Sequence, residues 1–125
     1  MPVYPGGGQA TLLYENRKAF LFNKEPIVAG QASVAVQLRR TRGDSYPFGA
    51  SFEISFDGAP GAFQVDIQTS DTDTPNTWVT INSVAGGLNA SNVGRVELPN
   101  FWATFTRVKV ISLANAVNTT VLVSR

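Results

Sequence analysis

The chain has 125 residues and a net charge of +1, and 43% of its residues are hydrophobic while 15% are charged, which is typical of one globular domain. It contains no cysteine, which excludes disulfides and thiolate metal sites, and no histidine, the commonest general base and transition-metal ligand. We see neither a secretory leader pattern nor an apolar run of about 18 residues, so we expect a protein that is not exported and has no membrane segment.

Residues 1–32 differ in character from the rest of the chain. They contain three prolines and the run Gly6–Gly8 together with many large apolar side chains. Proline lacks the amide donor that a strand ladder needs, so we expect little regular strand in this segment. The apolar side chains still need burial. An extended arm that lies against its own domain or against a neighbouring subunit would satisfy both conditions.

Charge is unevenly distributed along the sequence. Residues 1–42 carry six basic and two acidic side chains, a net charge of +4, whereas residues 43–125 carry four basic and seven acidic side chains, a net charge of −3. This asymmetry indicates an N-terminal segment that meets an acidic surface. The basic side chains are few and lie among apolar residues, so we do not expect that surface to be nucleic acid.

From residue 33 onward the sequence alternates between apolar and polar residues, as half-buried strands do. The segment ASVAVQLRR places Val34, Val36 and Leu38 on one face. Residues 52–56 and 63–67 alternate in the same way on either side of the turn sequence APG. This pair of segments predicts an antiparallel hairpin.

The second half of the sequence predicts further strands. TWVTINSV reads as one strand, and residues 95–98 read as a short strand that Pro99 should end. A long strand follows, with Thr106, Val108 and Val110 on one face. NTTVLVSR has the alternation of a last strand.

These patterns together predict an all-β fold. Seven or eight short strands with closely spaced turns are typical of an antiparallel β-sandwich or jelly roll. We expect residues 33–125 to form this β-sandwich (jelly-roll) domain of seven to eight strands. Residues 1–32 would form an extended N-terminal arm.

The residue types available leave little room for catalysis. Without histidine or cysteine, the options are paired carboxylates, a lysine nucleophile or a serine–lysine pair. The acidic residues on predicted strands occupy outward positions, where a solvated face is the simplest interpretation: Glu53, Asp66 and Glu97. There is no GxSxG elbow and no Walker loop. We therefore expect no enzymatic activity, no cofactor and no metal.

Two short motifs have a simpler explanation as turns. The segment DTDTPN at residues 71–76 has oxygen donors at alternate positions, as calcium loops do, but it lacks the glycine and the bidentate glutamate of an EF-hand. Arg42-Gly43-Asp44 is the tripeptide that integrins bind, yet Gly-Asp is also common in turns. We interpret both segments as connections between strands.

A longer set of segments points to a family. FEISFDGAPGAFQVDIQTSDTDTPNTWVTIN, followed by NVGRVE, FTRVKV and NTTVLVSR, resembles the small head decoration (cement) proteins of tailed bacteriophages that have jelly-roll folds. The resemblance covers approximately residues 48–125 and includes no catalytic signature. It implies a structural virion protein that binds the outer surface of the capsid, with the host cytoplasm as its location before assembly.

The resemblance also implies the partners. They are the major capsid protein, whose neighbouring copies would be cemented together, and further copies of the chain itself, with a trimer favoured over a dimer. Neither nucleic acid nor a membrane is expected as a partner. The N-terminal arm would be the main contact, because its apolar residues supply burial and its basic residues suit an acidic capsid face. The residues expected to bind the partner are Tyr4, Leu12, Leu13, Tyr14, Arg17, Lys18, Phe20 and Phe22.

The aromatic residues leave a second interpretation open. Aromatic platforms on β-sandwiches can stack on sugars, so a carbohydrate- or receptor-binding module of a phage tail is the alternative. It would place function in loop aromatics such as Tyr46. Trp78 and Trp102 each begin a strand pattern, and for them we expect core packing.

Overall fold

The fold is described from a computed structural model, which covers residues 11–13, 18–38, 48–101 and 104–124. Within these residues the chain forms nine strands and no helix, and hence no helix that could cross a membrane. The strands are β1 (Thr11–Leu13), β2 (Lys18–Pro26), β3 (Val36–Leu38), β4 (Phe48–Phe56), β5 (Phe63–Ser70), β6 (Val79–Val84), β7 (Val93–Phe101), β8 (Phe105–Leu113) and β9 (Asn118–Ser124).

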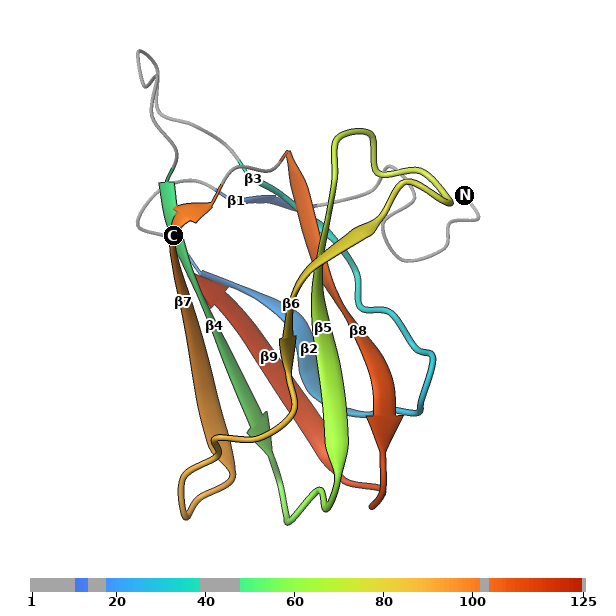
Figure 1. Ribbon diagram of the computed structural model, residues 1–125, viewed down its shortest axis with the longest axis vertical. Helices are drawn as coiled ribbons and strands as arrows, with labels where there is room; N and C mark the ends of the chain where they lie inside the picture. Colours follow the sequence, from blue (N-terminus) through green and yellow to red (C-terminus); the bar gives the residue numbers. More distant parts are fainter. Residues whose placement is uncertain (1–10, 14–17, 39–47, 102–103, 125) are drawn as a thin grey trace.

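The strands form two sheets that lie in two layers (Figure 1). Sheet A has the strand order β1-β3-β8-β5-β6, and sheet B has the order β2-β9-β4-β7. Among the described residues every pair is antiparallel except β1 with β3. The prediction of an all-β, β-sandwich-like structure is therefore confirmed.

The core lies between the two sheets and follows the predicted alternation. Phe52 and Ile54 of β4 are 0% and 1% exposed, and Ile67 of β5 is 0% exposed. Val108 of β8 and Val121 of β9 are also fully buried. Burial of each such side chain contributes about 1.5–3 kcal/mol. The inner faces of both sheets thus hold the layers together.

The predicted hairpin between residues 52–56 and 63–67 is wrong. β4 pairs with β7 and β9 in sheet B, whereas β5 pairs with β6 and β8 in sheet A. The connection between them crosses from one layer to the other, and the rings of Phe56 and Phe63 meet across it with centroids 5.0 Å apart. Both strands bury one side in the same core, but from opposite sheets. Each therefore shows the same apolar–polar alternation that it would show in a hairpin, and the alternation alone could not reveal that the connection crosses between sheets.

The structure also differs from the expectation of a separate arm that extends to residue 32. Residues 18–26 form β2, which pairs with β9, and Leu21, Phe22 and Ile27 belong to the core. The physical reason is that proline is excluded only from central strand positions. β2 lies at one end of sheet B and carries two register irregularities, and Pro26 is its last residue.

Two further strand boundaries differ from the prediction. β3 is short, and Val34 is 54% exposed rather than inward, because the chain before β3 runs irregularly. There Ser33 is fully buried, and its hydroxyl accepts the backbone amide of Val108 at 3.0 Å. β7 continues through Pro99 instead of ending there, since β7 lies at the other end of sheet B and needs fewer ladder bonds.

Candidate functional site

The predicted partner-binding residues do not form one surface. Leu13 and Phe22 are each 2% exposed and lie in the core of their own chain, so neither presents a surface to a partner. Lys18 is exposed and Phe20 is 50% exposed, both on β2. Leu12 lies in β1. Outside the described residues lie Tyr4, Tyr14 and Arg17, and with them Tyr46, Trp102 and the tripeptide at residues 42–44.

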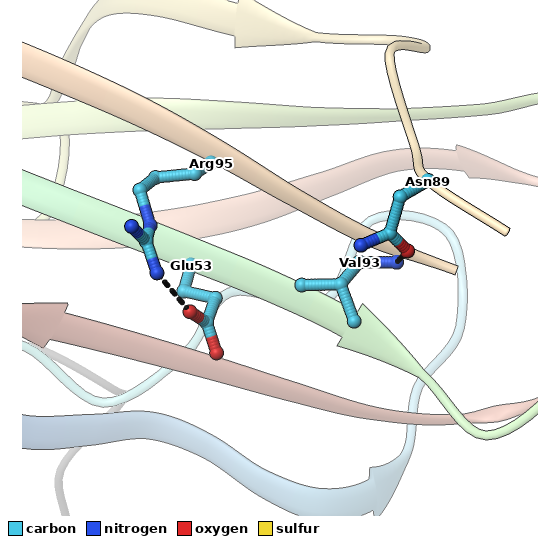
Figure 2. Close-up of polar contacts among 4 residues, drawn as sticks. All are labelled: Glu53, Asn89, Val93 and Arg95. Atoms are coloured by element: carbon cyan, nitrogen blue, oxygen red, sulfur yellow. Dashed lines mark hydrogen bonds and ion pairs between the residues drawn. The ribbon is translucent and has the colours of Figure 1, made fainter. Parts of the chain in front are cut away.

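The outer face of sheet B, where Phe20 and Lys18 lie, carries apolar side chains and an exposed ion pair. Phe20 is in register with Leu122 of β9, and Glu53 of β4 faces Leu122 from the other side. Arg95 of β7 donates to Glu53 at 2.7 Å, which raises the pKa of Arg95 (Figure 2). The two side chains are 58% and 37% exposed, so solvent screens this ion pair.

The turn that leads into β7 is held by one side chain. Asn89 Oδ1 accepts the backbone amides of Ser91 and Val93 at 2.9 and 3.0 Å, and Figure 2 shows the contact with Val93. Asn92 in this turn has a φ of 61°, a left-handed conformation that asparagine tolerates. These hydrogen bonds fix where β7 begins and therefore help to position Arg95.

The outer face of sheet A is organised around Asp66 of β5. Although Asp66 points away from the core, it is only 8% exposed. Its Oδ1 accepts from Gln64 Nε2 at 3.0 Å and from Ser83 Oγ at 2.7 Å, and its Oδ2 accepts from Thr80 Oγ1 at 3.2 Å. Lys109 of β8 is its register partner. Groups from three adjacent strands therefore converge on one carboxylate.

The environment of Asp66 favours its charged form. Burial acts to raise the pKa of Asp66, but the hydrogen bonds from Gln64, Ser83 and Thr80 and the positive charge of Lys109 lower it. The lowering effects together exceed the effect of burial, and the pKa lies below its usual value. Asp66 is therefore an acceptor at neutral pH.

The polar cluster continues along the same face to Trp78. Gln68 Nε2 donates to Thr80 Oγ1 at 3.3 Å, and Arg107 Nε donates to Gln68 Oε1 at 3.0 Å. The Arg107 guanidinium lies 4.4 Å from the centroid of the Trp78 ring, a cation–π contact. Trp78 thus packs on the outer face of sheet A and not in the core cluster, contrary to prediction.

Two β-bulges place isoleucines beside this cluster. Ile81 is the extra residue where β6 pairs with β5, and Ile111 is the extra residue where β8 pairs with β5. The side chain of Ile81 is 45% exposed and that of Ile111 is 40% exposed. Bulges often reorient a side chain beside a functional site. Here they present apolar area on both sides of β5.

The segment at residues 71–76 forms an internally bonded loop. Ser70 Oγ accepts the backbone amides of Thr72 and Asp73 at 3.2 and 3.1 Å, and Thr77 Oγ1 donates to the carbonyl of Thr74 at 2.6 Å. Within the described part of the chain, no group of three or more acidic, histidine or cysteine side chains is placed to hold a metal ion. The loop's polar atoms serve the turn itself.

A depression of about 500 Å³ lies at one end of sheet B. Small or apolar residues make up most of its lining, and Glu97 is its one ionisable lining residue among those described. Its lining is Gly49, Ala50, Ser51, Glu97, Leu98, Pro99 and Ser124. Its described lining residues show no set of mutually hydrogen-bonded polar side chains like the one on the outer face of sheet A.

Sequence reasoning missed this polar cluster for an identifiable reason. Alternation correctly placed Asp66 and Gln68 on the outward side of β5. It could not show that β6 and β8 flank β5, which brings Ser83 and Lys109 to the same carboxylate. The available signal was the concentration of hydrogen-bonding residues at outward positions of QVDIQ.

Comparison of the chain with known proteins found no similar protein. No protein-family model matches the chain, and neither a curated protein nor a solved structure matches it.

Proposed function

We propose that this protein is a non-enzymatic structural protein of a bacteriophage virion, which binds the outer capsid surface and cements neighbouring copies of the major capsid protein. The placement of Lys18 and Phe20 carries the proposal. Both are exposed on β2, directly after residues 1–17, which are rich in apolar side chains and carry one basic and one acidic side chain. A half-exposed phenylalanine beside a lysine offers apolar area and positive charge to an acidic partner face.

The strand pairing supports a jelly-roll fold for this role. A jelly roll can be described as a long hairpin of eight strands that is rolled up, so that the first strand pairs with the last and the second with the last but one. β2 pairs with β9, β3 with β8, β4 with β7 and β5 with β6. We infer that β2–β9 form a jelly roll and that β1 adds to it beside β3.

In this proposal the capsid contact uses only part of residues 1–32. Because Leu13 and Phe22 are buried in their own chain, they support β2 rather than touch the partner. The outward side of β2, Leu12 and residues 1–10 and 14–17 remain for the contact. Repetition over many lattice sites, and over a homo-oligomer in which a trimer is favoured over a dimer, would multiply weak contacts into firm attachment.

The copy number of the protein in purified virions tests this proposal. Quantitative mass spectrometry should find it at a near-stoichiometric ratio to the major capsid protein, and antibody should label the outer capsid surface. A handful of copies per particle would indicate a tail component and contradict cementing. Absence from virions would contradict a virion role altogether.

A further inference from the structure

We propose that the outer face of β5, β6 and β8 is a binding site for a neutral oligosaccharide, centred on Asp66, Ser83 and Lys109. This site is separate from the capsid contact proposed for β2, which lies in the other sheet. It uses none of the loop tyrosines. The proposal rests on the fixed polar groups of this face, their accessibility, their mixed charge and the apolar side chains beside them.

The polar groups are fixed before any ligand arrives. Asp66 holds Gln64, Thr80 and Ser83 by hydrogen bonds of 2.7–3.2 Å. Polar side chains on a solvated strand face ordinarily lose rotamer freedom on binding, which costs about 0.5–1.5 kcal/mol for each one. Here folding has already restricted them. A ligand would therefore meet donors and acceptors at set positions.

The fixed groups retain unused hydrogen-bonding capacity at the surface. Ser83 is exposed and Gln64 is half-buried, while the Asp66 carboxylate between them is almost covered. The Ser83 hydroxyl donates to Asp66 and keeps its lone pairs as acceptors. Lys109 is also half-buried, and its ammonium group brings three donors. Asp66 thus acts as a positioning residue, and its neighbours make the contacts.

The mixture of charges selects a neutral, hydroxyl-rich ligand. An anion that approaches Lys109 meets the Asp66 carboxylate in register beside it, and a cation that approaches Asp66 meets Lys109 and Arg107. A hydroxyl group both donates and accepts, so it can satisfy Lys109 and Ser83 together without a net charge. Sugars carry such hydroxyls on adjacent carbons.

Apolar side chains at both sides of the polar centre suit the carbon faces of sugar rings. Ile81 and Ile111 are exposed to 45% and 40%, and each is the extra residue of a bulge next to β5. Trp78, held against Arg107 at 4.4 Å, extends the face beyond Gln68. Fixed polar groups beside apolar side chains match the residue composition of small-molecule sites, here on the outer face of a sheet.

A glycan array of neutral and anionic oligosaccharides, probed with the full-length protein, tests this inference. We expect reproducible binding to one neutral class. The strongest neutral glycan is then titrated into ¹⁵N-labelled protein, and the amide shifts should concentrate on β5, β6 and β8. An array with no neutral binder, binding confined to anionic glycans, or shifts confined to other strands would each overturn the proposal.

Variants separate binding from folding. Ser83→Ala and Lys109→Ala should each weaken glycan binding about tenfold, the loss of one or two hydrogen bonds. Because Ser83 and Lys109 also stabilise the Asp66 carboxylate, both variants should melt somewhat lower than the native chain, and binding is compared at a temperature at which circular dichroism shows them folded. Arg95→Ala on the outer face of sheet B is the matched control and should bind as the native chain does. Unchanged affinity in both sheet A variants would contradict the assigned site. Capsid binding by these variants should be normal, which keeps this test distinct from the proposed virion role.

Discussion

The outer faces of the two sheets carry similar residue types but differ in how those residues are connected. On sheet B, Arg95 is the one partner of Glu53 among the described residues, and both side chains are well exposed. On sheet A, Asp66 has three hydrogen-bond donors and lies 8% exposed beside Lys109. Both acids sit at outward positions of alternating strands. The difference shows that the neighbours across the sheet, and not the alternation, decide whether a polar face is solvated or prearranged.

The largest expected effect is a difference in stability between two substitutions on β2, one on the side that faces the core and one on the side that faces solvent. Phe22→Ala should lower the free energy of unfolding by about 3–5 kcal/mol, because it removes a buried ring from the core. Phe20→Ala, two residues earlier and half exposed, should change it by less than about 1 kcal/mol. Urea denaturation of both variants measures the contrast. Equal effects would mean that β2 is not a strand of the sandwich.

Asp66→Ala tests the connected face of sheet A. The substitution removes three hydrogen-bonded contacts at a nearly covered site, and we expect a loss of about 1–3 kcal/mol in unfolding free energy. The matched change on sheet B, Glu53→Ala, should leave the urea midpoint almost unmoved, since its ion pair is exposed. If Glu53→Ala cost as much as Asp66→Ala, the contrast between the faces would be wrong.

Acidification should remove the contribution of the Asp66 carboxylate to the free energy of unfolding. The pKa of Asp66 is lowered in the folded protein, so its contribution to stability is present above the unfolded-state pKa and is lost as the pH falls through the lowered one. The stability difference between the native chain and Asp66→Asn should therefore be constant at neutral pH and shrink below about pH 4. Denaturation curves at pH 7, 5 and 3 measure it. A difference that grew on acidification would contradict the lowered pKa.

The smallest expected effect concerns the exposed pair of sheet B. Arg95→Gln should alter the melting temperature only slightly, and the change should become smaller still in high salt, because salt screens exposed charges. Thermal unfolding in low and high salt measures this change. A large, salt-independent loss would show that the pair is structurally important.

The sequence predicted the core far better than the arrangement of the strands. Alternation identified Phe52, Ile54, Val108 and Val121 as inward residues because burial follows a period of two. It failed at the connection from β4 to β5, where two inward-facing strands belong to different sheets. Pairing between distant strands has no local signal.

The N-terminal segment and the candidate site also depend on strand pairings that the sequence pattern does not reveal. Prolines and glycines suggested an arm through residue 32, yet β2 is a strand at the end of a sheet, where irregularity is tolerated. The cluster around Asp66 needed knowledge of which strands flank β5. Outward polar residues were visible in the sequence, and their convergence was not.

Co-sedimentation with purified capsids that lack the protein tests the proposed function most directly. The full-length native chain, the double variant Lys18→Glu/Phe20→Ser and the control Arg95→Gln would be compared at increasing concentration. We expect the native chain and the control to saturate the capsid, and the double variant, correctly folded by circular dichroism, to lose binding by about tenfold or more. Saturation by all three chains would contradict the role of β2, and failure of the native chain to bind would contradict capsid attachment itself.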